Sequence, residues 1–218
     1  MARPTKKAIA RAVLDRHGRT FAKELGIDVA KQTPSGLFQL LVFAMLSSTR
    51  ISADLAMRAA KALNKARWTT PKKMAEATWR QRVTVLNRSG YARYDESTSR
   101  MLQATCDLLL EEYGGDLRKL REAADRDPEQ QRKLIKQFKG IGDAGADIFF
   151  REVQLAWDEL YPFADKRMLK AAGRLDLGDS AGRLKRRVDS REDFVRLAAG
   201  LVRVDLDNDY EGVREAAT

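Results

Sequence analysis

Apolar residues recur at three- and four-residue spacing along most of the chain, and this spacing constrains the fold more than any other feature. It is the repeat of one face of a helix, whereas the alternation typical of a strand is nearly absent. Residues 35–48, SGLFQLLVFAMLSS, are apolar on almost every face, so we expect this helix at the centre of the core, starting near Thr33 and Pro34. The sequence therefore predicts an all-α fold of roughly ten to twelve helices.

Helix start and stop signals place the remaining helices. Pro71 opens one of them, and Gly114-Gly115 ends a long one. The polar tail after Asp207 is expected to fray. The other helices are expected at residues 5–16, 52–66, 71–77, 79–86, 95–113, 116–124, 128–138, 143–156 and 190–203, with one more beginning in YPFADKRMLKAAG.

The composition narrows the function. The 218 residues suffice for one large domain or two small ones. There are 41 Lys and Arg residues against 31 Asp and Glu, and the net charge of +10 favours a polyanionic partner over a merely solvated basic surface. The single cysteine, Cys106, excludes an internal disulfide and a thiolate metal cluster, and with His17 as the single histidine we expect neither a His-based metal site nor a Ser-His triad. We see neither a bilayer-spanning segment nor a secretory signal, so we expect a cytoplasmic protein without a membrane partner.

The stretch FKGIGDAGADIFF, residues 138–150, places three glycines within six positions between two predicted helices. Glycine permits positive φ and close approach of another backbone. A helix that opens after Gly142 exposes unpaired N–H groups, which can hold a phosphate oxygen, and Ile141 would turn inward as an apolar anchor. An ordinary turn between packed helices is equally compatible with the spacing.

Two further stretches could carry chemistry. Asp165 follows an apolar loop and opens a helix, so it suits an N-cap, a role compatible with facing a cleft. LSSTRIS, residues 46–52, follows the most apolar helix, and it either caps that helix or emerges from the core to meet a ligand. Basic residues cluster near these features in KQFKG, DKRMLK and GRLKRR, which suits a face that follows phosphates.

Four stretches, in order, resemble the helix-hairpin-helix DNA glycosylases of the endonuclease III superfamily. They are FQLLVFAMLSSTRISAD, NRSGYARYDESTSRMLQATCDLLLEEYGGDL, FKGIGDAGADIFF and YPFADKRMLKAAG, within residues 36–175. The resemblance implies a two-part helical fold with a central cleft. One part would be a six-helix domain of residues 34–140, and the other would combine residues 1–33 with 141–218.

The resemblance also implies roles for particular residues. A nucleotide would be flipped into the cleft, where Asp165 would stabilise positive charge on the sugar or orient a water molecule. The hairpin amides would hold a phosphate, with a possible monovalent cation on the hairpin carbonyls. The implied DNA contacts are Lys139, Gly140, Ile141, Gly142, Asp143, Ala144, Gly145, Thr49, Arg50, Lys166 and Arg167, and the implied base pocket includes Ser47, Tyr161 and Phe163.

The chain departs from the family pattern at several positions. Ala144 stands where bifunctional members carry the lysine that attacks the sugar, although Lys139, Lys166 or Lys170 could approach from another direction. Asp143 stands beside the presumed phosphate, where we expect it to weaken DNA binding. The four-cysteine loop that holds an iron–sulfur cluster is absent from the sequence.

We therefore expect a monomeric, monofunctional DNA glycosylase of base excision repair, which acts on double-stranded DNA of the nucleoid and needs no metal or other cofactor beyond the possible cation. The first alternative is a catalytically degenerate DNA-binding protein on the same scaffold. The second is a helical interaction module without a nucleic-acid partner, which the charge and the hairpin disfavour. The repair hypothesis requires the side chain of Asp165 to face a groove. The sequence does not indicate which base is removed.

Overall fold

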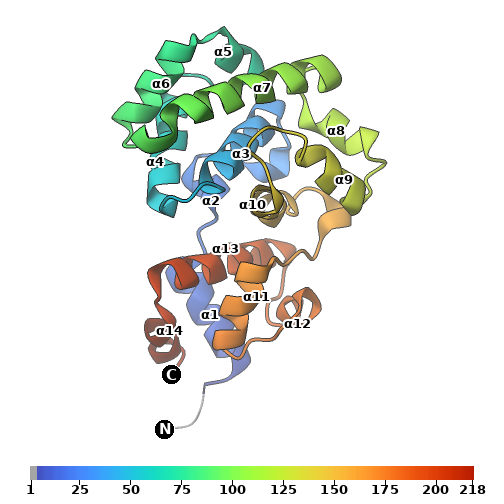
Figure 1. Cartoon of the computed structure of the whole chain (residues 1–218). Helices are drawn as coiled ribbons and strands as arrows, with labels where there is room; N and C mark the ends of the chain where they lie inside the picture. Colours follow the sequence, from blue (N-terminus) through green and yellow to red (C-terminus); the bar gives the residue numbers. More distant parts are fainter. Residues whose placement is uncertain (1–3) are drawn as a thin grey trace. The chain divides into compact units, whose positions relative to one another are not determined.

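The computed structural model describes residues 4–218, and within that range the chain forms α-helices, short 3-10 helices and no strand (Figure 1). The all-α prediction is confirmed. Fourteen α-helices are present among these residues, more than the ten to twelve expected. The additional ones are short, such as α2 (Phe21–Glu24) and α12 (Ala181–Lys185), and so few residues give no readable apolar period.

The bounds of most helices agree closely with the sequence pattern. The long helix α7 (Asp95–Tyr113) has the predicted bounds of residues 95–113. The remaining elements are α1 (Lys6–His17), η1 (Val29–Lys31), α3 (Pro34–Ser47), α4 (Ala53–Lys65), α5 (Pro71–Glu76), α6 (Trp79–Arg88), η2 (Ala92–Tyr94), α7 (Asp95–Tyr113), α8 (Leu117–Ala123), α9 (Pro128–Ile135), α10 (Asp143–Val153), η3 (Asp158–Leu160), α11 (Lys166–Arg174), α13 (Arg191–Asp207) and α14 (Tyr210–Ala216).

The chain forms two compact units. One is Leu25–Phe149, and the other joins the N-terminal residues up to Glu24 with Phe150–Thr218. The expected domain bounds were 34–140 and 1–33 plus 141–218. The observed division falls inside α10, so the whole hairpin belongs to the first unit. Packing explains this, because a β-carbon at Gly145 would lie 3.5 Å from the β-carbon of Ser48.

Helix α3 forms the core of the Leu25–Phe149 unit, as its apolar sequence predicts. Ten of its fourteen residues are buried, and they lie on every face of the helix. Helices α4 and α8 pack against it, while α5 and α6 pack against α7 (Figure 1). The start of α3 is fixed by Thr33, whose hydroxyl accepts the N–H of Gly36, and by Pro34 in the first turn.

A buried arginine and the single cysteine lie beside this core. Arg82 donates to the carbonyl oxygens of Met74 and Ala77 at 2.9 and 2.5 Å and to the hydroxyl of Ser99 at 3.2 Å. It therefore ties the end of α5 to α6 and α7, and burial lowers its pKa. Cys106 is fully buried, and burial raises the pKa of its thiol to about 12, which fits a small apolar residue in the core.

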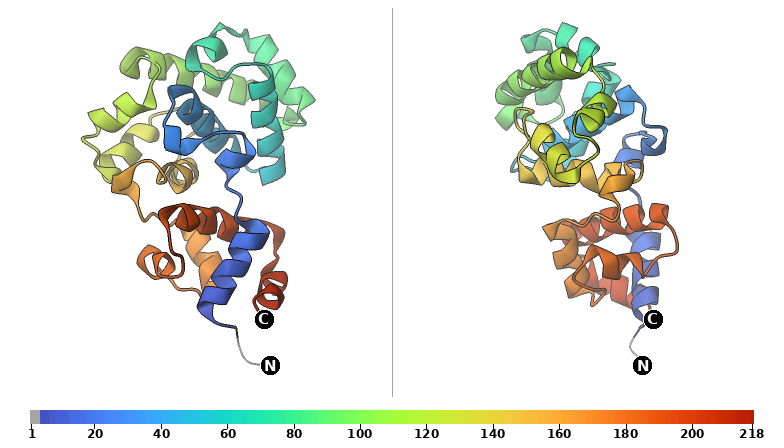
Figure 2. Two further views of the ribbon diagram at one scale, coloured as in Figure 1. Left: turned by 180° about the vertical axis from the view of Figure 1, so that it is seen from behind. Right: turned by 90° about the vertical axis from the view of Figure 1, so that its right-hand side faces the viewer.

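In the other unit α13 packs against α1 and α11, and α14 packs against α1 (Figure 2). The prediction that the tail after Asp207 frays is wrong, because α14 buries Tyr210 and Val213. The Arg174 guanidinium lies 3.6 Å from the centre of the Tyr210 ring, and the tyrosine hydroxyl donates to Asp205 at 2.8 Å. Among residues 4–218, none of the helices combines the length and the apolar character needed to cross a bilayer.

Candidate nucleic-acid interface

The glycine stretch forms a tight hairpin between α9 and α10. Gly140 has φ +92°, and a β-carbon there would lie 2.7 Å from the sulfur of Met101, so both backbone conformation and packing require glycine. Ile141 is 4% exposed and points into the unit, as predicted. Gly142, in contrast, has nothing within 4 Å of the position that a β-carbon would occupy. The hairpin is therefore anchored on one side and open on the other.

The open side of the hairpin presents backbone. Lys139, Gly140, Gly142, Asp143 and Ala144 are exposed. The first N–H groups of α10 have no acceptor within the helix, and they carry the positive end of its dipole. The backbone geometry that the sequence predicted for holding a phosphate is therefore available, although an exposed turn has the same features.

The LSSTRIS loop lies against the hairpin. The Ser48 hydroxyl donates to the carbonyl oxygens of Met45 at 2.8 Å and Gly140 at 3.1 Å. Ser48 was not among the predicted site residues, because nothing in the sequence distinguishes it from the serine and threonine on either side. The structure thus brings the loop bearing Ser47, Thr49 and Arg50 next to the hairpin.

The side chains of this loop have different environments. The Thr49 hydroxyl is bound to the carbonyl of Leu46 at 2.8 Å and to the hydroxyl of Tyr91 at 3.0 Å, so it supports the loop from inside. Arg50 is exposed, and within residues 4–218 no hydrogen bond or ion pair holds its guanidinium. The Ser47 hydroxyl is buried without a hydrogen-bond partner among the described residues. Arg50 is therefore the side chain of this loop that is available to a ligand.

Asp143 does not stand as an isolated negative charge beside the hairpin. Its carboxylate lies 2.7 Å from the amine of Lys136 and 3.8 Å from the guanidinium of Arg132. Arg132 also pairs with Asp147 at 2.6 Å. The Lys136 pair compensates the charge of Asp143, so we expect it to repel a phosphate less than the sequence suggested.

Asp165 belongs to the other unit, and its carboxylate is sealed in the interior. One oxygen accepts the N–H groups of Arg167 and Met168 at 2.9 and 3.0 Å, which confirms the N-cap interpretation. The other oxygen accepts from Nε of Arg151 at 2.7 Å, and the two side chains are 2% and 5% exposed. The repair hypothesis requires the side chain of Asp165 to face a groove, and in this arrangement it does not. Arg151 would have to release the carboxylate before it could meet a sugar.

Glu152, which follows Arg151 on α10, is a second buried carboxylate, and no sequence pattern pointed to its role. It accepts the N–H groups of Phe21 and Ala22 at 3.2 and 3.0 Å, so it caps α2. Burial raises the pKa of Glu152, against the opposing effects of these hydrogen bonds and of Arg151 and Arg203. Both Arg151 and Glu152 therefore hold other segments of this unit in place.

The predicted base-pocket residues of this unit, Tyr161 and Phe163, make contacts with other residues of the protein. Lys185 and Arg191 lie over the ring of Tyr161, at 4.9 and 5.1 Å from its centre, and the ring of Phe194 contacts it edge-on. Gln154 holds the backbone of Phe163 through both its N–H and its carbonyl. The ring of Tyr161 is thus covered by protein contacts that a stacked base would have to displace, and the backbone of Phe163 is held in place.

Two predicted basic residues open α11. Arg167 is paired with Asp205 at 2.8 Å, whereas Lys166 is exposed. Together with Asp165, Tyr161 and Phe163 they belong to the unit that contains Phe150–Thr218, while the hairpin and the LSSTRIS loop belong to Leu25–Phe149. The predicted site residues therefore form two groups, one in each unit.

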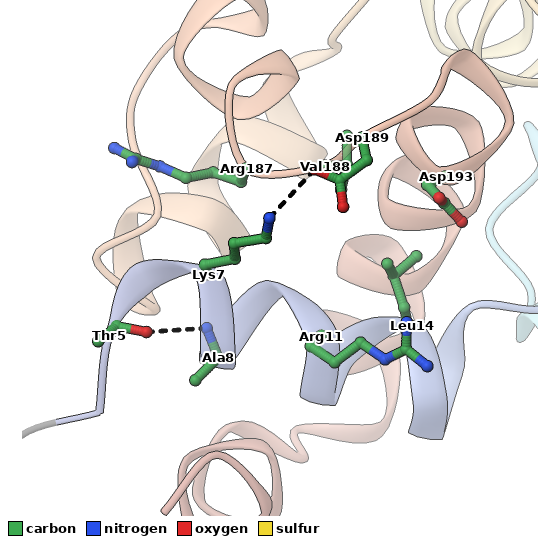
Figure 3. Close-up of a pocket in the computed structure, with 9 residues that line it drawn as sticks. All are labelled: Thr5, Lys7, Ala8, Arg11, Leu14, Arg187, Val188, Asp189 and Asp193. Atoms are coloured by element: carbon green, nitrogen blue, oxygen red, sulfur yellow. Dashed lines mark hydrogen bonds and ion pairs between the residues drawn. The ribbon is translucent and has the colours of Figure 1, made fainter.

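A surface hollow of about 330 Å³ lies beside α1 and the segment that precedes α13 (Figure 3). Lys7 points across it and pairs with Asp189 at 3.1 Å. Arg11, Arg187 and Asp193 also line it, so its charges are mixed, and none of the predicted site residues contributes to it. The hollow therefore adds nothing to the predicted site.

The arrangement defines a class: an all-α, helix-hairpin-helix fold with an exposed glycine hairpin. The fold is that of endonuclease III, because the chain is similar to a solved structure of a trapped endonuclease III–DNA covalent intermediate, an estranged-adenine complex, with a TM-score of 0.50. The similarity covers 92% of this chain and 85% of that chain at 17% sequence identity. The predicted endonuclease III-like fold is confirmed. No protein-family model and no curated protein matches the sequence.

Proposed function

We propose that the protein binds duplex DNA through the hairpin backbone and does not itself excise a base. The observation that carries the proposal is the exposed turn from Gly140 to Ala144, anchored by buried Ile141 and by the hydrogen bond from Ser48. Backbone N–H groups at a helix start suit a phosphate oxygen, and the net charge of +10 favours a polyanion. The solved structure with the same fold is a complex with DNA, which supports the same partner here.

Two positions bear on excision. Ala144 offers no amine to attack a sugar, which argues against the bifunctional route and leaves only hydrolysis by water. Asp165 would have to stabilise positive charge on the sugar, but its own charge is already balanced by Arg151 at 2.7 Å, and its side chain is 2% exposed. We infer that the aspartate serves the start of α11 and the buried ion pair.

The proposal is tested by adding a charge to the open side of the hairpin. Gly142→Glu places a carboxylate beside the presumed phosphate, and a like-charge pair costs about 1 kcal/mol or more at ~4 Å, which corresponds to roughly five- to ten-fold weaker binding. Gly142→Ala is the matched control, because its β-carbon would enter open space. Fluorescence anisotropy with a labelled duplex, over a range of salt concentrations, measures both variants.

Binding of Gly142→Glu that equals that of the control would contradict the hairpin as the contact. Binding of the wild-type protein that ignores salt concentration would contradict a phosphate contact altogether. Circular dichroism of each variant confirms that the fold is retained.

A monofunctional glycosylase is the second candidate, favoured by the position of Asp165 as the N-cap of α11, where the resemblance places the catalytic aspartate. Duplexes that carry uracil, alkylated, oxidised or mismatched bases are incubated with the protein and then treated with alkali. Strand breaks at one lesion that disappear in a folded Asp165→Asn variant would establish this candidate. Retained duplex binding without breaks at any lesion would support the proposal that the protein binds DNA without excising a base.

The implied monovalent cation would be held by carbonyl oxygens of the hairpin. The Gly140 carbonyl already accepts from Ser48, and it keeps a second lone pair for a cation. A cation there would screen the phosphate from the nearby carboxylates. Exchanging sodium for a bulky tetraalkylammonium ion at constant ionic strength is expected to weaken duplex binding if this site contributes.

A further inference from the structure

The positive charge of the chain is concentrated away from the hairpin. Residues 50–93, which form α4, α5, α6 and η2, contain eleven Lys and Arg residues and two acidic residues, a net charge of +9 out of +10 for the whole chain. Residues 94–149, which include the hairpin, contain nine basic and twelve acidic residues. A hairpin in an acidic setting needs attraction from elsewhere to hold DNA.

We propose that α4, α5 and α6 form a second phosphate-binding surface that holds the backbone of the same DNA beyond the hairpin. The α4–α6 basic surface is defined by Arg58, Lys65, Lys72, Lys73, Arg80 and Arg88, all exposed. The inference rests on the proposed binding of duplex DNA. Helices α4 and α6 pack together, and they lie on the opposite side of their unit from α8 and α9 (Figures 1 and 2).

The cations of this surface lack carboxylate partners. Within residues 4–218, none of the six makes an ion pair, and the two acids of the stretch, Asp54 and Glu76, are unpaired as well. Some exposed cations elsewhere in the same unit are matched with acids, as in the pairs Arg118–Asp116 at 2.6 Å and Lys136–Asp143 at 2.7 Å. The α4–α6 basic surface therefore has uncompensated charge.

Helix stability does not account for the cations at the starts of α5 and α6. Lys72 and Lys73 lie in the first turn of α5, and Arg80 lies in the first turn of α6, where neither helix has an acidic residue. Cations at a helix start oppose the helix dipole, and acidic residues are favoured there. These residues therefore add to the positive field of the surface at some expense of local stability, as a surface built for an anion would.

The geometry of α4 suits a backbone contact. Arg58 and Lys65 are two turns apart on the face opposite the buried Ala59, Ala60 and Leu63, which separates them by about 10 Å along the axis. The guanidinium of Arg58 lies 3.7 Å from the position that a β-carbon of Gly90 would occupy, two residues after Arg88. The surface thus continues from α4 to the end of α6.

The chemistry of the surface favours nucleic acid over an acidic protein. An interface with a protein partner normally has a centre of apolar side chains. Among residues 50–93, Trp79 is the one large apolar side chain that is exposed, so this surface does not provide such a centre. Phosphate contacts need only cations, because duplex DNA presents one charge per ~1.7 Å of its axis.

The test removes three charges without altering the hairpin. The variant Arg58→Gln/Lys65→Gln/Arg88→Gln is compared with Lys119→Gln/Arg126→Gln/Lys133→Gln, which removes three exposed cations from residues 94–149. Anisotropy gives the affinity for a 30-base-pair duplex against salt. We expect the slope of log affinity against log salt to fall in magnitude by about 2 to 3 in the first variant only, since each phosphate contact contributes about 0.9.

Each outcome supports or contradicts binding of DNA by the α4–α6 basic surface. Equal slopes in the two variants would show a general effect of net charge and overturn the inference, as would competition by polyglutamate as strong as that by DNA. If Gly142→Glu binds the duplex more weakly than the wild type does, but the first triple variant has the same salt slope as the control triple variant, the hairpin proposal stands and this inference fails. If the wild-type protein does not bind duplex at all, the proposed function itself fails.

Discussion

At the scale of single residues, the decisive observation is the use that the structure makes of buried charge. Asp165, Arg151 and Glu152 lie in the interior, and each is satisfied by a specific partner. Buried charges are costly unless they are paired, so these residues hold the unit together in the arrangement observed. A carboxylate used in this way is a structural group unless its partner moves.

We predict that Asp165→Asn destabilises the protein by about 3–5 kcal/mol, because it leaves Arg151 buried without a counter-charge. Asparagine caps a helix about as well as aspartate, so the change isolates the ion pair from the cap. Urea unfolding followed through Trp157, which is buried in the same unit, measures the loss. The double variant Arg151→Met/Asp165→Asn is expected to recover part of it. A loss below about 1 kcal/mol would mean that the carboxylate is available for chemistry.

Glu152 gives a prediction about pH. Burial raises its pKa above the ordinary value of 4.5, so the folded state binds the proton more tightly than the unfolded state. The stability that this provides is present below about pH 4.5 and is lost as the pH rises through the folded pKa. The free energy of unfolding of Glu152→Gln, relative to wild type, should therefore increase from pH 4.5 upward. The exposed Glu215→Gln is the control, and a pH-independent difference for Glu152→Gln would contradict the prediction.

At the scale of elements, the hairpin shows how two glycines in one motif differ. Gly140 combines φ +92° with a close approach to Met101, whereas Gly142 borders open space. The sequence motif treats both as equivalent turn residues. Only the first is required to be glycine by the fold, whereas the second has room for a side chain.

We predict that Gly140→Ala destabilises the Leu25–Phe149 unit by about 1–3 kcal/mol, because alanine adopts positive φ at a cost and its β-carbon meets the Met101 sulfur. Gly142→Ala should change stability by no more than about 0.5 kcal/mol. Thermal unfolding of the two variants side by side measures the difference. Equal effects would mean that the hairpin is not held as the structure describes.

At the scale of the whole molecule, two units with separate cores carry two groups of candidate residues. Contact between DNA and the hairpin in the way that the resemblance implies can be tested at Ala144. This residue is exposed at the start of α10, where the resemblance places the lysine of bifunctional glycosylases.

We predict that Ala144→Lys can be trapped on abasic duplex DNA by borohydride, whereas the wild-type protein and Ala144→Gln cannot. The new amine would form an imine with the sugar aldehyde, and borohydride would reduce it to a stable adduct. Gel electrophoresis detects the adduct. Trapping of the wild type would reveal another reactive lysine, and failure of Ala144→Lys with retained duplex binding would contradict the implied docking.

The local spacing of apolar residues in the sequence was enough to predict much of the fold. The three- and four-residue spacing gave the all-α class, the buried centre at residues 35–48 and the bounds of α7, because apolar periodicity acts within a few turns of chain. It missed α14, whose stability depends on packing of Tyr210 and Val213 against distant segments. The exposed glycine hairpin was predictable for the same local reason, since turn residues determine turn geometry.

The helices, the hairpin and the excess of positive charge follow from the sequence without the tertiary structure. The helices and the hairpin depend on residues close together in the chain, and the excess of charge depends only on composition. Only the three-dimensional fold shows that Asp165 is sealed against Arg151, that Ser48 holds the hairpin, and that six unpaired cations are exposed on α4, α5 and α6. Burial and charge pairing depend on which distant segments meet in space. A linear pattern can place a carboxylate at a helix start, but only the fold shows that an arginine fourteen residues earlier already occupies it.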